Sequence, residues 1–142
     1  MPTRSLTRTA LALVAAAFAA CIVVQVFLAG LGVFDGPAAF ITHRNFGYII
    51  GWLTVVMLVL AVAGRAGRRL IGLSALTLVQ MALQSVFVVL RQDAPAVAAL
   101  HPVNGVLLLL VTVVIARSAW ASRSAGSAAA ERLEAPERGL AS

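Results

Sequence analysis

The chain repeats one pattern in DGPAAFITHRNFGYIIGWLTVV (residues 35–56) and DAPAVAALHPVNGVLLLLVTVV (residues 93–114). Both stretches have the spacing Asp-x-Pro-Ala-x4-His-x3-Gly, and both end in Thr-Val-Val. Asp, Pro, His and Thr are scarce in this apolar chain, so their recurrence indicates two helical hairpins that descend from one. Each stretch opens an apolar run long enough to cross a bilayer. We therefore expect His43 and His101, the only two histidines, to lie at the same depth in the membrane.

Composition indicates an integral membrane protein. Apolar residues make up 61% of the chain and charged residues 11%, with a mean hydropathy of +0.99, which lies outside the range of soluble domains. Four apolar stretches are each near or above the ~20 residues that an α-helix needs to span the hydrocarbon layer. These predicted spans cover residues 9–34, 38–63, 70–90 and 94–116.

The spans predict an all-α fold, a four-helix transmembrane bundle with up-down-up-down topology. The two hairpins are then related by a pseudo-twofold axis along the membrane normal. A cytoplasmic N-terminus (residues 1–8) precedes the membrane domain (residues 9–116). Residues 117–142 are rich in Ala, Ser, Arg and Glu and have few large apolar side chains, so we expect a disordered cytoplasmic tail.

The distribution of arginine predicts the orientation. All 11 basic residues are Arg, and nine of them precede the first span, separate the second from the third, or follow the fourth. Only Arg44 and Arg91 lie on the other side, so the positive-inside rule predicts that both termini are cytoplasmic. The expected partner of the chain is the lipid bilayer, whose anionic lipids attract a protein with a net charge of +6. Nucleic-acid binding is not expected, because no aromatic residues interleave the basic ones.

The repeat predicts that two imidazoles face each other across the bundle. The second and fourth helices are diagonal neighbours in this topology, so His43 and His101 approach one central space from opposite sides. Gly47 and Gly105 follow one turn later on the same helix faces. Such glycines leave room for a flat macrocycle beside its ligands, although close helix packing explains them equally well. Pro102 is expected to kink the fourth helix beside His101.

Other polar residues fall in the same outer layer as the histidines. Gln25, Gln84 and Asn104 are expected to face the bundle interior, either around a ligand or in inter-helical hydrogen bonds. Arg44 and Arg91 are candidates to pair with haem propionates. Their alternative role is to extend toward lipid headgroups.

The sequence lacks the residues that several classes of protein need for their function. A zinc or di-metal site needs at least three converging His, Cys or carboxylate ligands, and the predicted spans hold two histidines and one cysteine, Cys21. A proton-coupled transporter usually needs an intramembrane carboxylate, and the spans contain none. No Ser-His-Asp or Cys-His arrangement for nucleophilic catalysis is evident.

Three segments carry a family resemblance: QVFLAGLGVF (residues 25–34), HRNFGY (residues 43–48) and DAPAVAALHPVNG (residues 93–105). They resemble a family of small four-span bacterial membrane proteins of unknown function. That resemblance implies the bacterial cytoplasmic (inner) membrane as the location. More loosely, a helix with His-Arg-x-x-Gly-Tyr near its outer end is similar to the ligand helices of four-helix transmembrane b-type cytochromes and ferric-reductase-like proteins.

The looser resemblance implies that His43 and His101 are axial ligands of one haem b. A single histidine pair allows only one such haem. The leading hypothesis is therefore an electron-transfer protein with an unidentified redox partner, rather than a hydrolase or transferase. Two alternatives remain: a structural or accessory membrane protein whose histidines make inter-helical hydrogen bonds, and a protein that binds lipid or a small molecule without metal.

Overall fold

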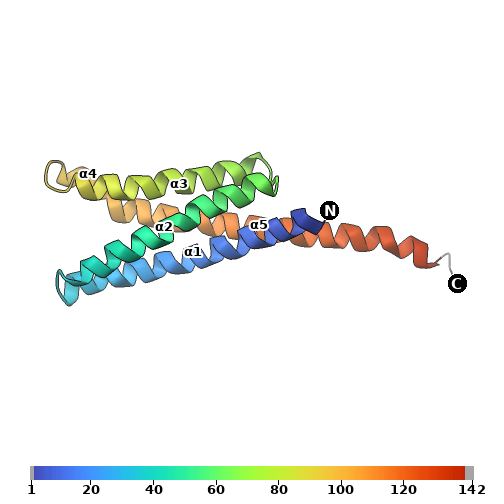
Figure 1. Ribbon diagram of the computed structural model, residues 1–142, viewed down its shortest axis with the longest axis horizontal. Helices are drawn as coiled ribbons and strands as arrows, with labels where there is room; N and C mark the ends of the chain where they lie inside the picture. Colours follow the sequence, from blue (N-terminus) through green and yellow to red (C-terminus); the bar gives the residue numbers. More distant parts are fainter. Residues whose placement is uncertain (1, 140–142) are drawn as a thin grey trace.

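The computed structural model describes the backbone of residues 2–139 and the side chains of residues 5–122. Within that part every regular element is a helix: α1 (Pro2–Phe34), α2 (Ala39–Ala63), α3 (Arg68–Val89), α4 (Pro95–Ala98) and α5 (Leu100–Gly139) (Figure 1). Four segments are long and apolar enough to cross a membrane: Ser5–Phe34, Ala39–Ala63, Arg68–Val89 and Pro95–Ser122. The predicted all-α class with four membrane spans is confirmed.

The four long helices form two antiparallel hairpins, α1–α2 and α3–α5. Each of α1 and α3 packs against both α2 and α5, which makes α2 and α5 diagonal neighbours. We call the end with the α1–α2 connection (residues 35–38) and the α3–α5 connection (residues 90–99) the loop end. The opposite end, with the α2–α3 connection (residues 64–67), is the terminal end. In the view of Figure 1 the two hairpins lie farther apart at the loop end.

The buried positions repeat between the hairpins. Four buried residues of α2 recur as buried residues of α5, each 58 positions later in the chain. Leu11 and Ala15 of α1 likewise recur in α3 as Leu70 and Ser74, but 59 positions later. The repeat seen in the sequence is therefore also a repeat of packing. The matched α2 and α5 residues are Ile50 and Leu108, Thr54 and Thr112, Met57 and Ile115, and Ala61 and Ala119.

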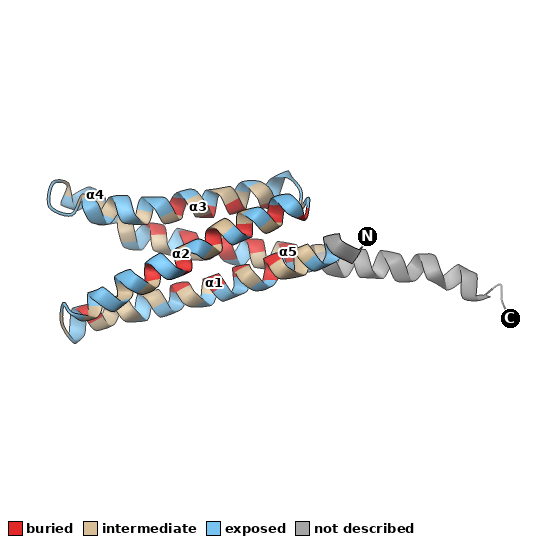
Figure 2. Ribbon diagram, in the orientation of Figure 1, coloured by how far each residue is buried: buried red, intermediate tan, exposed pale blue. Residues whose placement is uncertain are grey.

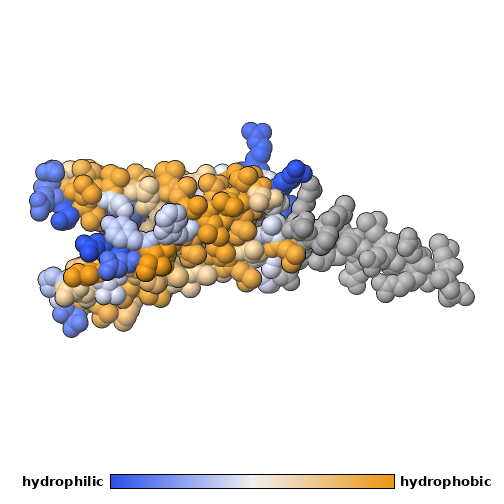
Figure 3. All heavy atoms as spheres, viewed as in Figure 1, coloured by the Kyte–Doolittle hydropathy of each residue, from blue (hydrophilic) through white to orange (hydrophobic). Residues whose placement is uncertain are grey.

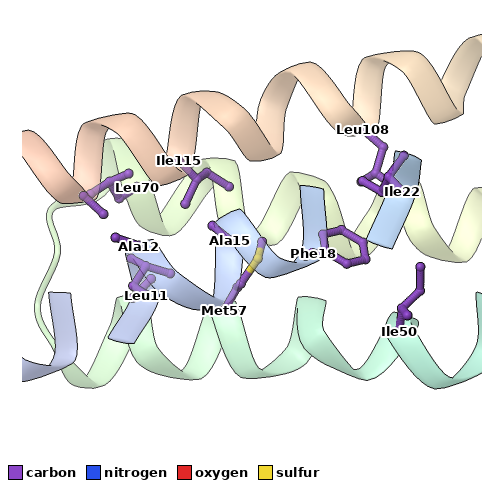
Figure 4. Close-up of a cluster of buried hydrophobic side chains, with 12 residues drawn as sticks. Leu11, Ala12, Ala15, Phe18, Ile22, Ile50, Met57, Leu70, Leu108 and Ile115 are labelled. Atoms are coloured by element: carbon purple, nitrogen blue, oxygen red, sulfur yellow. The ribbon is translucent and has the colours of Figure 1, made fainter. Parts of the chain in front are cut away.

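The apolar core fills the terminal half of the bundle. Phe18 and Met57 lie at its centre, fully buried (Figure 4). Toward the loop end the core stops at Ile22, Ile50 and Leu108, and no described apolar side chain beyond them is buried. Figure 2 shows fewer buried residues, drawn in red, toward the loop end than in the terminal half. The loop end therefore has a less tightly packed interior, and the histidines lie there.

The outer surface is apolar over most of its length. Figure 3 shows an orange band between hydrophilic atoms at the two ends. Large side chains such as Ile49 and Trp52 are 69% and 71% exposed, respectively. An exposed apolar band of this extent suits lipid rather than water.

The fourth span is interrupted beside His101. α4 ends at Ala98, and α5 begins at Leu100, which puts Pro102 in its first turn. Pro102 has no N–H to donate to the carbonyl of Ala98, and its ring would clash with that carbonyl in a continuous helix. The first turn tolerates the missing donor, so the helix restarts there. In place of the kink expected at Pro102, the helix is interrupted at Ala99, between α4 and α5.

The end of the chain differs from the prediction of a disordered tail. The backbone of α5 remains helical from Leu100 to Gly139, well beyond residue 116. Alanine is the strongest helix former, and residues 117–139 are rich in it. Residues 140–142 lie outside the part of the chain that the structure describes.

Candidate histidine site

The two imidazoles meet across the bundle at the loop end. His43 lies on α2 and His101 in the first turn of α5, so they come from diagonal helices. Their ring centroids are 6.1 Å apart, and the ring planes make an angle of 64°. Both side chains are partly buried. The prediction that these rings oppose each other from the two hairpins is confirmed.

Each histidine is held by a backbone carbonyl of its own hairpin. Nδ1 of His43 donates to the Gln25 carbonyl oxygen at 3.0 Å, and Nδ1 of His101 donates to that of Gln84 at 3.1 Å. A carbonyl oxygen only accepts, so each Nδ1 must carry the hydrogen. In a neutral ring this leaves the lone pair on Nε2. Metal-binding histidines usually have this arrangement, with the second nitrogen donating to a carbonyl or carboxylate.

The glycines below the histidines receive glutamine side chains. A Cβ placed on Gly47 would lie 2.5 Å from Nε2 of Gln25, and one on Gly105 would lie 3.2 Å from a terminal atom of the Gln84 amide. Each hairpin thus contains the same three parts: a glutamine carbonyl on the imidazole, a glutamine amide, and a glycine that leaves space for this amide. The amide occupies the space that the sequence assigned to a macrocycle.

The two glutamine amides differ in their partners. In the orientation that satisfies both its ends, the Gln84 amide donates to the His101 carbonyl oxygen at 2.9 Å and accepts from the Gly105 N–H at 3.3 Å. Oε1 of Gln25 is buried and has no hydrogen-bond partner among the described residues. Oε1 of Gln80 in α3 is likewise buried without a partner among the described residues, so the halves differ only in the glutamine that lies beside each histidine.

The sequence predicts Gln25 and Gln84 in this layer and pairs them as a weak match displaced by one residue, but it does not predict that their carbonyls accept from the histidines. The histidines are 58 positions apart and the glutamines 59, so the two hairpins do not align as one continuous repeat. The signal lay within each hairpin, as Gln-x17-His in the first and Gln-x16-His in the second. One extra residue between the paired positions of the first hairpin shifts the register.

The other predicted residues lie around the pair. Asn104 is buried and donates from Nδ2 to the Gln80 carbonyl oxygen at 2.8 Å, which joins α5 to α3. Arg44 and Arg91 are exposed near the loop end, and Arg91 donates to the Val88 carbonyl oxygen at 3.1 Å. The structure does not bring either guanidinium onto a histidine, and their pairing with propionates stays a prediction.

The donor set limits the metal chemistry. Among the described residues, no group of three or more His, Cys, Asp or Glu side chains converges on a point that could hold a metal ion. A protein-bound zinc needs three or four such ligands. Ligation by two imidazoles suits a metal whose remaining ligands come from a macrocycle.

Comparison with known proteins identifies a matching family whose activity is unknown. Residues 25–90, slightly less than half of the chain, match a family of unknown function, DUF6220. That match confirms the resemblance to a family of unknown function. It includes Gln25, His43 and Gln84 and ends before His101. No curated protein and no solved structure matches the chain, so the looser resemblance to b-type cytochromes stays a prediction.

Proposed function

We propose that this membrane protein binds one haem b between His43 and His101 and serves in electron transfer. One observation supports this most directly: two imidazoles from diagonal helices lie 6.1 Å apart, each with Nδ1 on a backbone carbonyl. A metal–nitrogen bond of ~2 Å on each side, plus ~1 Å from each nitrogen to its ring centre, corresponds to ring centres ~6 Å apart. The spacing suits axial ligation of a single iron.

The glutamine carbonyls have a defined role in this proposal. By accepting from Nδ1 they fix the tautomer, hold the ring orientation and raise the basicity of Nε2. Because both acceptors are helix backbone atoms, the imidazoles are positioned by α1 and α3 rather than by mobile side chains. Haem supplies a one-electron iron couple, and two imidazole ligands leave no open position for oxygen activation.

Room for the macrocycle requires movement of the glutamine side chains. Gln25 can turn away at little cost in hydrogen bonds, because its Oε1 has no partner among the described residues. Gln84 would have to give up two bonds. We therefore expect the macrocycle to displace Gln25 and to leave Gln84 in place. Arg44 and Arg91, at the loop end, are the cations available to the propionates.

Visible spectra test the proposal. Protein expressed with haem available and purified in detergent should show a sharp α band after reduction, and His43→Ala and His101→Ala should each abolish it. Asn45→Ala, an exposed neighbour of His43, is the matched control and should keep the band. In His43→Gly, added imidazole should restore the band, which separates ligation from folding. Colourless wild-type protein with a helical circular dichroism spectrum would refute haem binding.

The structural alternative has its own support. The two Nδ1 bonds already tie α2 to α1 and α5 to α3 without any metal, and the ring contact joins the hairpins. In a purely accessory protein, His43→Ala and His101→Ala would lower the free energy of unfolding while no variant, the wild type included, bound haem. The same samples therefore distinguish the two functions.

A further inference from the structure

A surface groove lies at the terminal end, on the opposite half of the molecule from the histidines. A groove of about 380 Å³ runs along the surface between α1 and α5. Its volume falls within the ~300–1,000 Å³ of small-molecule sites. Its lining is almost entirely apolar and small, with Arg117 and Trp120 as its largest members. The alanines that line it are Ala12, Ala16, Ala116 and Ala121.

Cations beside this groove lack a counter-ion within the described side chains. Arg117 lines the groove and is exposed. Arg8 lies one turn before Ala12 on α1, and its Nε is buried with no hydrogen-bond partner among the described residues. The acidic side chains that the structure describes, Asp35 and Asp93, are both at the loop end. An anion that pairs with Arg8 or Arg117 would therefore come from outside this part of the chain.

We propose that the groove binds an anionic phospholipid. One acyl chain lies along the alanines, where the short side chains leave space, and the phosphate lies between Arg8 and Arg117. Trp120 supplies the amphipathic ring that suits the boundary between acyl chain and headgroup. An apolar groove with cations beside it complements an anionic lipid better than a zwitterionic lipid or a soluble anion.

Tryptophan fluorescence tests this directly, because the chain has only two tryptophans, Trp52 and Trp120. Trp52→Phe leaves Trp120 as the single reporter. In phosphatidylcholine vesicles with a minor fraction of brominated lipid, brominated phosphatidylglycerol should quench Trp120 well beyond its mole fraction. Brominated phosphatidylcholine should quench it only in proportion.

Variants separate a site from general charge attraction. Arg117→Gln should reduce the preference for phosphatidylglycerol about fivefold, whereas Arg69→Gln, a cation at the same end but outside the groove, should leave it unchanged. Ala16→Leu should fill the groove and abolish the preference without altering charge, and Ala17→Leu on another face of α1 is its control.

Equal quenching by the two lipids refutes the site, as does a loss of preference in Arg69→Gln equal to that in Arg117→Gln. Protection of Trp120 from both lipids, with a changed oligomeric state in Ala16→Leu, would assign the groove to a second copy of the chain instead.

Discussion

The α1–α2 and α3–α5 hairpins hold equivalent histidines with unequal support. In both, a glutamine carbonyl accepts from Nδ1, at 3.0 Å for His43 and 3.1 Å for His101. Only the second hairpin adds the buried bond from Asn104 to the Gln80 carbonyl and a Gln84 amide that makes two hydrogen bonds. At the equivalent of Asn104 the first hairpin has Phe46, which packs against the apolar core.

The first hairpin uses aromatic packing where the second uses hydrogen bonds. The ring of Phe40 lies 6.4 Å from that of His43, nearly perpendicular to it, and covers Gly32 of α1. The duplicated feature is therefore the placement of the imidazoles, while the residues around them differ between the hairpins. Each hairpin has one buried glutamine Oε1 without a partner among the described residues, Gln25 in the first and Gln80 in the second. Only Gln25 is the glutamine beside a histidine, so in the proposed function Gln25 is the side chain that yields space to the haem.

Removal of matched core side chains should have the largest effect and should be equal in the two hairpins. Met57→Ala and Ile115→Ala each delete a fully buried side chain at equivalent positions, so each should lower the free energy of unfolding by ~2 kcal/mol through lost packing. Denaturant unfolding in detergent measures this free energy. Val59→Ala, on an exposed site, serves as the control and should change little. A cost confined to one hairpin would show that the packing is not duplicated.

Glutamine removal should separate the two halves. Gln84→Ala loses an amide that makes two hydrogen bonds and should cost ~1 kcal/mol. Gln25→Ala removes a buried Oε1 without a partner and leaves the backbone carbonyl on His43, so the free energy of unfolding should stay within ~0.5 kcal/mol of wild type. The same unfolding assay compares them. Equal costs would contradict the proposed difference in satisfaction.

A smaller cost than that of Gln84→Ala is expected for the extra bond of the second hairpin. Asn104→Leu deletes the donor to the Gln80 carbonyl and should cost ~0.6 kcal/mol, the average for an inter-helical hydrogen bond in a membrane protein. Hydrogen exchange at the loop end of α5 should rise in this variant and stay unchanged in Phe46→Leu, which deletes no hydrogen bond. Unchanged exchange in Asn104→Leu would mean that the bond does not hold the hairpin together.

Much of the fold follows from local pattern. The second predicted span begins at residue 38 and α2 begins at Ala39, because a Gly-Pro turn comes directly before an uninterrupted apolar run. Gly36 adopts a φ of +122°, a conformation that residues with a side chain rarely adopt. The glycine in the sequence therefore predicts a turn at this position. The extension of α5 to Gly139 was missed, because a polar Ala-rich segment has high helix propensity but no apolar face to reveal it.

The four spans, their pairing into two hairpins and the opposed histidines all follow from the order of the residues, because hydropathy and a spaced repeat need no other information. The contacts of each imidazole could be found only from the packing of the helices. The acceptors are backbone carbonyls, which no residue type announces, and the equivalence of Gln25 and Gln84 depends on a one-residue difference in hairpin length. Side-chain rotamers then decided that the glutamine amides, rather than open space, lie against Gly47 and Gly105.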